Sequence, residues 1–134
     1  MSIALDTNVL VRLLVRDDEA QFNAAKRLVD QAAAADESIL IVLCALMETE
    51  WALRSRYRLD KASIAMAFGQ LLESRGVTFE HEPTVEEALD LWAQHSTADF
   101  ADCLLLARAA QLGRTRFVTF DAGAAKLPLA ELLT

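Results

Sequence analysis

The stretch Ile3-Ala4-Leu5-Asp6-Thr7-Asn8-Val9-Leu10 decides the fold that we expect for this chain. Its apolar start, 3–5, is typical of a buried strand in a parallel sheet. Beyond the polar residues, apolar side chains recur at helical spacing, at Val9, Leu10, Leu13 and Leu14. Asp6 therefore lies at the carboxyl end of a strand, where open α/β sheets place their chemistry. The alternative is that Asp6 only caps the helix, as Asp often does.

Similar alternation continues along the chain. Further strands are expected at 39–43, 77–80 and 116–120, and a weak apolar segment lies at 129–133. Helices are expected at 9–14, 17–35, 45–57, 60–72, 84–92 and 99–109. Strands that alternate with helices predict an α/β domain. We expect a three-layer α/β/α arrangement with a central, mostly parallel sheet of four to five strands.

Polar residues mark the expected helix starts. Asp60 is the expected N-cap of its helix, and Asp99 is the best N-cap candidate before the helix at 99–109. Thr84 and Glu87 have the spacing of a capping box.

Length and composition indicate one globular domain, 1–134, since 54% of the 134 residues are hydrophobic and 25% are charged. The longest apolar run, 39–47, is far shorter than the ~20 residues that cross a bilayer. The N-terminus lacks the pattern of a secretory signal, so a cytoplasmic protein without membrane association is expected. Cys44 and Cys103 lack metal-site spacing and are interpreted as reduced packing thiols.

The net charge of −7, from 13 basic and 20 acidic residues, argues against a simple nucleic-acid-binding module. It does not exclude an enzyme whose acids hold metal ions, because bound cations reverse the local charge.

Four acids are expected to meet at one edge of the sheet. Asp6 and Asp121 each follow a strand, while Glu48 and Asp102 lie near the starts of helices that begin at that edge. Carboxylates gathered in this way repel each other unless divalent cations neutralise them. Oxygen ligands favour Mg²⁺, for which Mn²⁺ is expected to substitute. With Mg²⁺ present, the natural reaction is attack of an activated water on a phosphodiester.

Each acid also has a purely structural interpretation. Asp102 could stabilise the helix dipole from the first turn, and Asp121 could begin a turn. Glu48 and Glu50 point to nearly opposite helix faces, so only one can enter the cleft, and helical periodicity does not choose between them. The two histidines, His81 and His95, are isolated, which disfavours zinc chemistry.

Four segments together carry a family resemblance: Leu5-Asp6-Thr7-Asn8-Val9-Leu10-Val11-Arg12, 46–57, Ala98-Asp99-Phe100-Ala101-Asp102-Cys103-Leu104 and Thr119-Phe120-Asp121. In this order and spacing, the chain resembles a PIN domain, and more closely a VapC-type toxin of the bacterial toxin–antitoxin systems. The resemblance covers essentially the full length, and it is the set of segments that makes it specific.

The resemblance implies a Mg²⁺-dependent endoribonuclease. The catalytic acids that it implies are Asp6, Glu48, Asp102 and Asp121. The implied metal ligands are Asp6, Asp102 and Asp121, with Asp99 as a further outer ligand. Glu48 is preferred to Glu50 because the family's helix glutamate lies three positions before the tryptophan, here Trp51.

The resemblance also implies roles around the metal and partners outside the chain. Asn8 and Thr119 would orient carboxylates or water. A homodimer and a separate antitoxin protein are implied as partners. One departure from the family pattern is Ala122-Gly123-Ala124, which follows Asp121 where relatives often carry a further polar or acidic residue.

Basic residues near the expected cleft suggest how RNA could bind. Arg12, Arg54 and Arg56 could hold phosphates, and Tyr57 could stack on a base. The alternative for the cluster at 54–58 is a solvated helix end, where cations suit the dipole.

Two rival functions remain open from the sequence. One is an inactive PIN-like scaffold that only binds protein or RNA. The other is a different Mg²⁺-dependent phosphoryl-transfer domain, such as a receiver or a haloacid-dehalogenase-type phosphatase. Asn8 stands where such a phosphatase would carry a second acid, so the phosphatase fits poorly. Asp6 lacks the acidic neighbour of a receiver, so the receiver also fits poorly.

Overall fold

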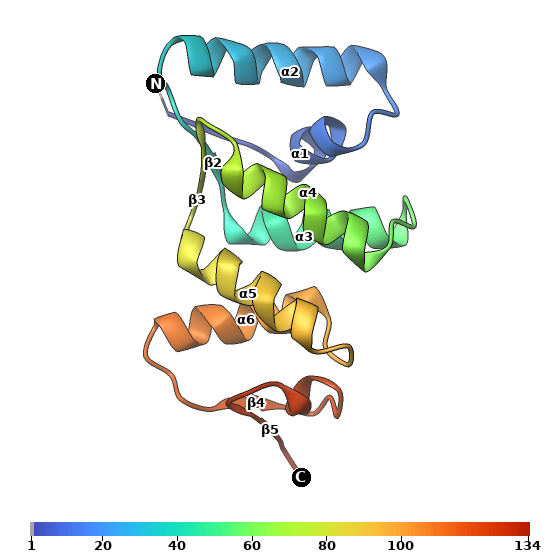
Figure 1. The fold of residues 1–134 in the computed structure, drawn as a ribbon, viewed down its shortest axis with the longest axis vertical. Helices are drawn as coiled ribbons and strands as arrows, with labels where there is room; N and C mark the ends of the chain where they lie inside the picture. Colours follow the sequence, from blue (N-terminus) through green and yellow to red (C-terminus); the bar gives the residue numbers. More distant parts are fainter. Residues whose placement is uncertain (1) are drawn as a thin grey trace. The chain divides into compact units, whose positions relative to one another are not determined.

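A computed structural model describes residues 2–134. The contacts of the chain divide it into two compact units, Met1–Glu80 and His81–Thr134, here called the N-terminal and C-terminal units. Figure 1 labels the helices and strands of both units.

The N-terminal unit packs four helices with a parallel sheet. Its elements are β1 (Ile3–Ala4), α1 (Thr7–Leu14), α2 (Glu19–Ala34), β2 (Ile39–Ile41), α3 (Leu43–Ser55), α4 (Lys61–Glu73) and β3 (Val77–Phe79). The strand order is β1-β2-β3, and β2 pairs in parallel with both neighbours, with Ile39 opposite Ile3 and Val77. α1 packs against both α2 and α3.

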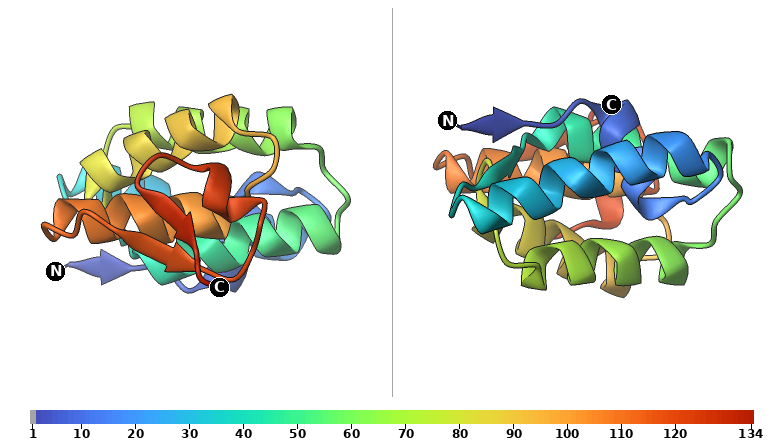
Figure 2. Two further views of the ribbon diagram at one scale, coloured as in Figure 1. Left: turned by 90° about the horizontal axis from the view of Figure 1, so that it is seen from below. Right: turned by 90° about the horizontal axis from the view of Figure 1, so that it is seen from above.

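The apolar runs of the sequence form the interior of this unit. Leu5, Ala32 and Ile39 are buried together, with Val9 and Leu28 packed against them. The cluster joins the segment after β1 to α2 and β2, so burial of this short run fixes where Asp6 emerges. The right-hand view of Figure 2 shows the N-terminal strand running directly into the turn that leads to α1.

The C-terminal unit contains two packed helices and a second parallel sheet. Its elements are α5 (Glu82–Gln94), α6 (Phe100–Gln111), β4 (Phe117–Thr119), the 3-10 turn η1 (Ala124–Lys126) and β5 (Ala130–Leu132). β4 and β5 pair in parallel and lie side by side in the left-hand view of Figure 2. Between the helices, Trp92 meets Phe100 edge to face at a centroid distance of 5.2 Å.

The α/β class and the parallel direction of the strands are confirmed. The five strands form one three-stranded and one two-stranded sheet, each within one unit. The segment at 129–133 contains β5, none of whose residues is buried, so the strand has no buried side to alternate with an exposed one. The single domain over 1–134 stays a prediction.

The helix-start predictions are confirmed at two places and wrong at a third. The carboxylate of Asp60 accepts from the Ser63 backbone N–H at 2.8 Å, and Asp99 is the N-cap of α6. The capping box at Thr84 is wrong, because α5 begins earlier, at Glu82, with His81 as its N-cap. Thr84 is buried inside the first turn, where its hydroxyl meets the His81 ring nitrogen Nδ1 at 2.9 Å.

Of the two cysteines, only Cys103 is a buried packing residue. Cys44 is exposed, so its predicted packing role is wrong, because the second position of α3 faces outward. Within residues 2–134, the structure contains no helix with both the length and the apolar character of a membrane span.

Candidate active site

Two of the four predicted acids line one pocket in the N-terminal unit. The pocket has a volume of about 260 Å³. Its lining consists of Asp6, Thr7, Asn8, Val11, Arg12, Glu48, Ala52, Arg56 and Tyr57. The walls are α1 with its N-cap, and α3 with the residues directly after it, and the two helices pack against each other. The pocket therefore combines two carboxylates with two guanidinium groups and one phenol.

Asp6 follows the first strand and is also the N-cap of α1. Its Oδ1 accepts a hydrogen bond from the backbone N–H of Thr7 at 2.7 Å. The two interpretations from the sequence are therefore compatible, because the cap uses one carboxylate oxygen and the side chain still lines the pocket. Asn8, two residues further on, lines the same pocket.

α3 carries Glu48 and Glu50 on different faces. Glu48 is exposed and lines the pocket beside Asp6. Glu50 is only 2% exposed, and its carboxylate accepts from Nε of Arg54 at 2.8 Å. Two positions on a helix differ by about 200° in direction, so both side chains cannot enter one pocket. The structure places Glu48, and not Glu50, with Asp6.

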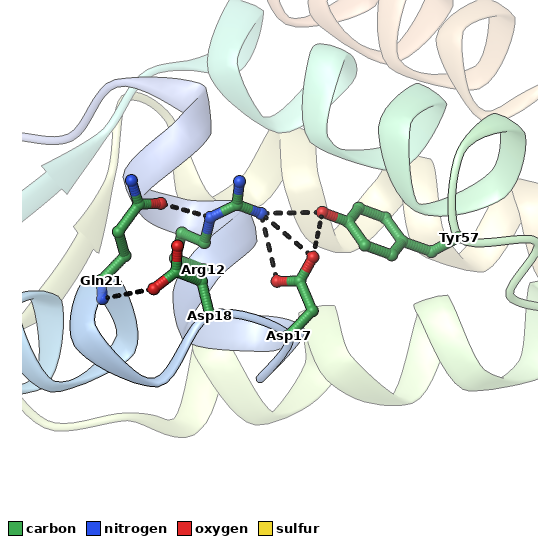
Figure 3. A network of polar contacts seen from close by, with 5 residues as sticks. All are labelled: Arg12, Asp17, Asp18, Gln21 and Tyr57. Atoms are coloured by element: carbon green, nitrogen blue, oxygen red, sulfur yellow. Dashed lines mark hydrogen bonds and ion pairs between the residues drawn. The ribbon is translucent and has the colours of Figure 1, made fainter.

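Arg12 is the centre of a polar network at the rim of this pocket (Figure 3). Its Nη1 donates to the Tyr57 hydroxyl at 2.8 Å and to Oδ1 of Asp17 at 3.1 Å. Its Nε donates to the side-chain oxygen of Gln21. The Tyr57 hydroxyl in turn donates to Oδ2 of Asp17 at 3.0 Å. Tyr57 first and then Asp17 raise the pKa of Arg12, so the guanidinium stays charged and joins α1 to both α2 and the end of α3.

The second arginine of the pocket, Arg56, has different surroundings. Its guanidinium carbon lies 5.7 Å from the ring centroid of Trp51, which lies five positions earlier, on α3. Trp51 is 52% exposed. A cation–π contact at such an exposed site contributes only about 0.5–1 kcal/mol. Arg56 is therefore held much more loosely than Arg12.

The C-terminal unit brings together the other predicted acids. The Asp99 backbone N–H donates to Oδ2 of Asp102 at 3.3 Å, as in a capping box at the start of α6. Partial burial is the main reason that the pKa of Asp102 is raised above its ordinary value, and the charges of Asp99 and Asp121 raise it further. The bond from Asp99 opposes this rise. The carboxylate of Asp102 is thus close enough to Asp99 and to Asp121 to be repelled by both.

Asp121 is fixed by the turn that follows β4. Its Oδ1 accepts from the backbone N–H groups of Gly123 and Ala124, at 2.7 and 3.1 Å. The Thr119 hydroxyl accepts from the Asp121 backbone N–H at 3.0 Å. Asp121 therefore begins a turn, as one interpretation of the sequence held. Thr119 contacts its backbone, while the carboxylate lies near Asp102.

Gly123 permits a close approach that the sequence did not reveal. The Thr97 hydroxyl donates to the Gly123 carbonyl at 2.9 Å. A Cβ at Gly123 would lie 2.3 Å from the Thr97 carbonyl oxygen and 3.2 Å from Oδ1 of Asp121. The contact holds the loop before α6 against the turn after β4. The glycine within the segment 122–124 thus has a steric reason.

The acids are grouped by unit. Asp6 and Glu48 line one pocket, and Asp99, Asp102 and Asp121 interact within the other unit. Among residues 2–134, no group of three or more His, Cys, Asp or Glu side chains has the geometry of a formed metal site. All candidate ligands are carboxylate oxygens, which is the donor set that Mg²⁺ and Mn²⁺ prefer.

Two residues near the candidate sites, Trp51 and Thr97, were not predicted to have a role there. Trp51 served only to align the helix glutamate, although an aromatic side chain so near the cluster at 54–58 was a usable signal. Thr97 carries no motif, and only its contact with Gly123 distinguishes it.

The PIN domain family model matches residues 3–129. The chain belongs to this family. Among solved structures, it is similar to the crystal structure of VapC20 from Mycobacterium tuberculosis, described as a sarcin-ricin loop cleaving toxin. The identity is 23%, the TM-score is 0.44, and the match covers 97% of this chain and 99% of that one. No curated protein matches the chain.

Proposed function

We propose that the protein is a Mg²⁺-dependent endoribonuclease and the toxin of a toxin–antitoxin pair. The observation that carries the proposal is the pairing of Asp6 and Glu48 in one pocket that also contains Arg56. A pocket with carboxylates for a cation and a guanidinium for a phosphate suits a phosphodiester substrate. Membership of the PIN family and the VapC-like motifs of the sequence support this reading.

The catalytic acids of the proposal are Asp6, Glu48, Asp102 and Asp121. Asp6, Asp102 and Asp121 would hold the metal, with Asp99 as an outer ligand. Burial first, and then the charges of Asp99 and Asp121, raise the pKa of Asp102, and a bound cation would favour the ionised form of this carboxylate. When bound, Mg²⁺ supplies Lewis-acid activation of water and of the phosphodiester.

The residues around the acids would position them. Thr119 contacts the Asp121 backbone at 3.0 Å, which limits where that carboxylate can move. Asn8 lines the pocket beside Asp6 and can orient a carboxylate or a water through its amide. These residues act through the acids and would not touch the reacting atoms.

The proposed partners are an antitoxin and a second copy of the chain. The carboxylates of Asp6 and Glu48, on a protein with a net charge of −7, could accept an arginine or lysine that a partner inserts in place of the metal. This inhibition would be competitive with Mg²⁺, which an antitoxin peptide and a metal titration can test together.

Cleavage of single-stranded RNA by purified protein tests the enzyme. We expect cleavage with Mg²⁺ or Mn²⁺, none in EDTA, and none by Asp6→Asn or Asp102→Asn. Asp30→Asn is the matched control, because Asp30 is an exposed acid that pairs with Lys26 on α2, away from the pocket. Cleavage that persists in EDTA would overturn the metal mechanism.

The inactive scaffold is the second candidate, and metal binding separates it from the enzyme. Isothermal titration should show Mn²⁺ binding to the wild type and a weaker signal for Asp6→Asn. Expression without a partner should arrest growth, and the same substitution should relieve the arrest. Growth arrest by Asp6→Asn equal to that of the wild type would separate toxicity from nuclease activity.

A further inference from the structure

We infer that Arg56 and Trp51 form a contact site for single-stranded RNA beside the Asp6–Glu48 pocket. Arg56 would bind a phosphate of the RNA, and the indole of Trp51 would stack on an adjacent base. The inference rests on the proposed function for its substrate class and assigns the residues that recognise that substrate.

The first step is that the two arginines of the pocket are not equivalent. Arg12 already donates to Asp17 at 3.1 Å, to Tyr57 at 2.8 Å and to Gln21. A phosphate at Arg12 would compete with a carboxylate that is already bound. Within the described residues, no ion pair involves Arg56. Arg56 can therefore bind a phosphate without first breaking an ion pair within the protein.

The other candidates for RNA contact, Arg54 and Tyr57, already make hydrogen bonds within the protein. Arg54 binds the buried carboxylate of Glu50 at 2.8 Å. The Tyr57 hydroxyl accepts from Arg12 and donates to Asp17, which fixes its ring at the rim. Loss of either contact would leave a polar group without its partner, so neither side chain is free to follow a mobile strand.

The second step is the exposure of Trp51. Over half of this large apolar side chain is in solvent, 52%, and the described contact over its ring is Arg56 at 5.7 Å. A guanidinium over an exposed ring is readily displaced or shared. Aromatic side chains bind single strands by stacking with bases, and arginine next to the ring binds the backbone. Trp51 provides the aromatic ring and Arg56 provides the cation for the backbone.

The stacking contact selects single-stranded RNA. In a double helix the bases are stacked on each other, and an indole cannot reach their faces. A site of this kind tolerates different bases, because every base has a π-face. We expect little base preference from this site, so sequence preference would come from elsewhere.

Tryptophan fluorescence tests the inference without any need for cleavage. The only other tryptophan, Trp92, is 5% exposed, so quenching by RNA reports on Trp51. The probe is a short mixed-sequence oligoribonucleotide titrated into Asp6→Asn protein in EDTA. We expect saturable quenching with the single strand and much weaker binding of the same strand annealed to its complement.

Variants assign the two roles separately. Trp51→Ala should raise the Kd, followed by anisotropy of a labelled strand, on the order of tenfold, with Trp51→Phe in between. Arg56→Ala should reduce the slope of log Kd against log salt by about 0.7, and Arg56→Lys should restore it. Arg75→Ala is the control for an exposed arginine outside the pocket.

Several results would overturn the site. An unchanged Kd for Trp51→Ala, equal binding of single and double strands, or no quenching at all would each do so. Dissociation of an oligomer by Trp51→Ala with unchanged RNA binding would assign this face to a protein contact instead. Binding and quenching without cleavage by the wild type in Mg²⁺ would support the contact site and refute the nuclease, so the two failures are distinguishable.

Discussion

Gly123 lies against the Thr97 carbonyl so closely that a Cβ on Gly123 would be 2.3 Å from that oxygen. The Thr97 hydroxyl also donates to the Gly123 carbonyl at 2.9 Å. This contact links the loop that leads to Asp99 and Asp102 with the turn that holds Asp121. The mutual positions of these acids thus depend on a residue without a side chain.

Gly123→Ala should therefore destabilise the protein by about 2 kcal/mol, since an extra methyl group at a closed contact forces the backbone apart. Urea denaturation measures this change. Gly69→Ala is the matched control: nothing lies within 4 Å of its Cβ position in α4, and alanine there should stabilise the helix by about 1 kcal/mol. A Gly123→Ala protein as stable as the wild type would show that the loop can relax freely.

Asp102 makes stability depend on pH. Its raised pKa means that the folded protein holds this proton more tightly than the unfolded chain. Stability is therefore lost as the pH rises from the ordinary carboxyl pKa through the raised one. In EDTA, the free energy of unfolding of Asp102→Asn relative to the wild type should therefore be more favourable at about pH 7 than at about pH 4. Denaturation curves at both pH values measure the difference in stability, and the same difference at both would contradict the raised pKa of Asp102.

Glu80 should contribute to the start of α3. Val42, the N-cap, provides no side-chain hydrogen bond, and Oε1 of Glu80 instead accepts from the Leu43 backbone N–H at 3.0 Å. Glu80→Ala should cost about 1 kcal/mol, as for the loss of an N-cap, and Glu80→Gln should cost less. The exposed Glu86 of α5 is the control, with an expected change below about 0.5 kcal/mol on substitution by alanine. Equal effects of both alanine variants would remove the capping role.

The Tyr57 hydroxyl should hold the end of α3 near α1. Tyr57→Phe removes the group that contacts both Arg12 and Asp17 and keeps the ring. We expect faster hydrogen exchange at 54–57 and unchanged exchange in α4. A double-mutant cycle with Asp17→Asn should be non-additive, because the two side chains share one contact. Additive effects would show that the network is not coupled.

The sequence predicted the elements well where short-range patterns determine them. The apolar run before Asp6, the N-caps Asp60 and Asp99, and the stripes of the helices all depend on neighbours within a few residues. The start of α5 was misplaced, although Pro83 in the first turn was a local signal for an earlier start. The strand signal of β5 was weak because its three residues, Ala130–Leu132, include no β-branched or aromatic side chain.

Long-range contacts explain what the sequence could not predict in the site. The spacing of Arg12 placed it near the pocket, but its engagement depends on Tyr57, 45 positions away. The choice between Glu48 and Glu50 needed the family pattern, because apolar residues surround α3 on most sides. The role of Gly123 depends on Thr97, 26 positions earlier.

Asp6 begins α1 with the same carboxylate that lines the pocket, and this has a practical consequence for anyone who needs a harmless form of the protein. Asparagine caps helices about as well as aspartate, whereas alanine does not. Asp6→Asn should thus give an inactive but fully folded protein, suitable for production and co-crystallisation. Asp6→Ala should unfold at a lower temperature. Equal midpoints of thermal unfolding for the two variants would contradict the capping role of the side chain at position 6.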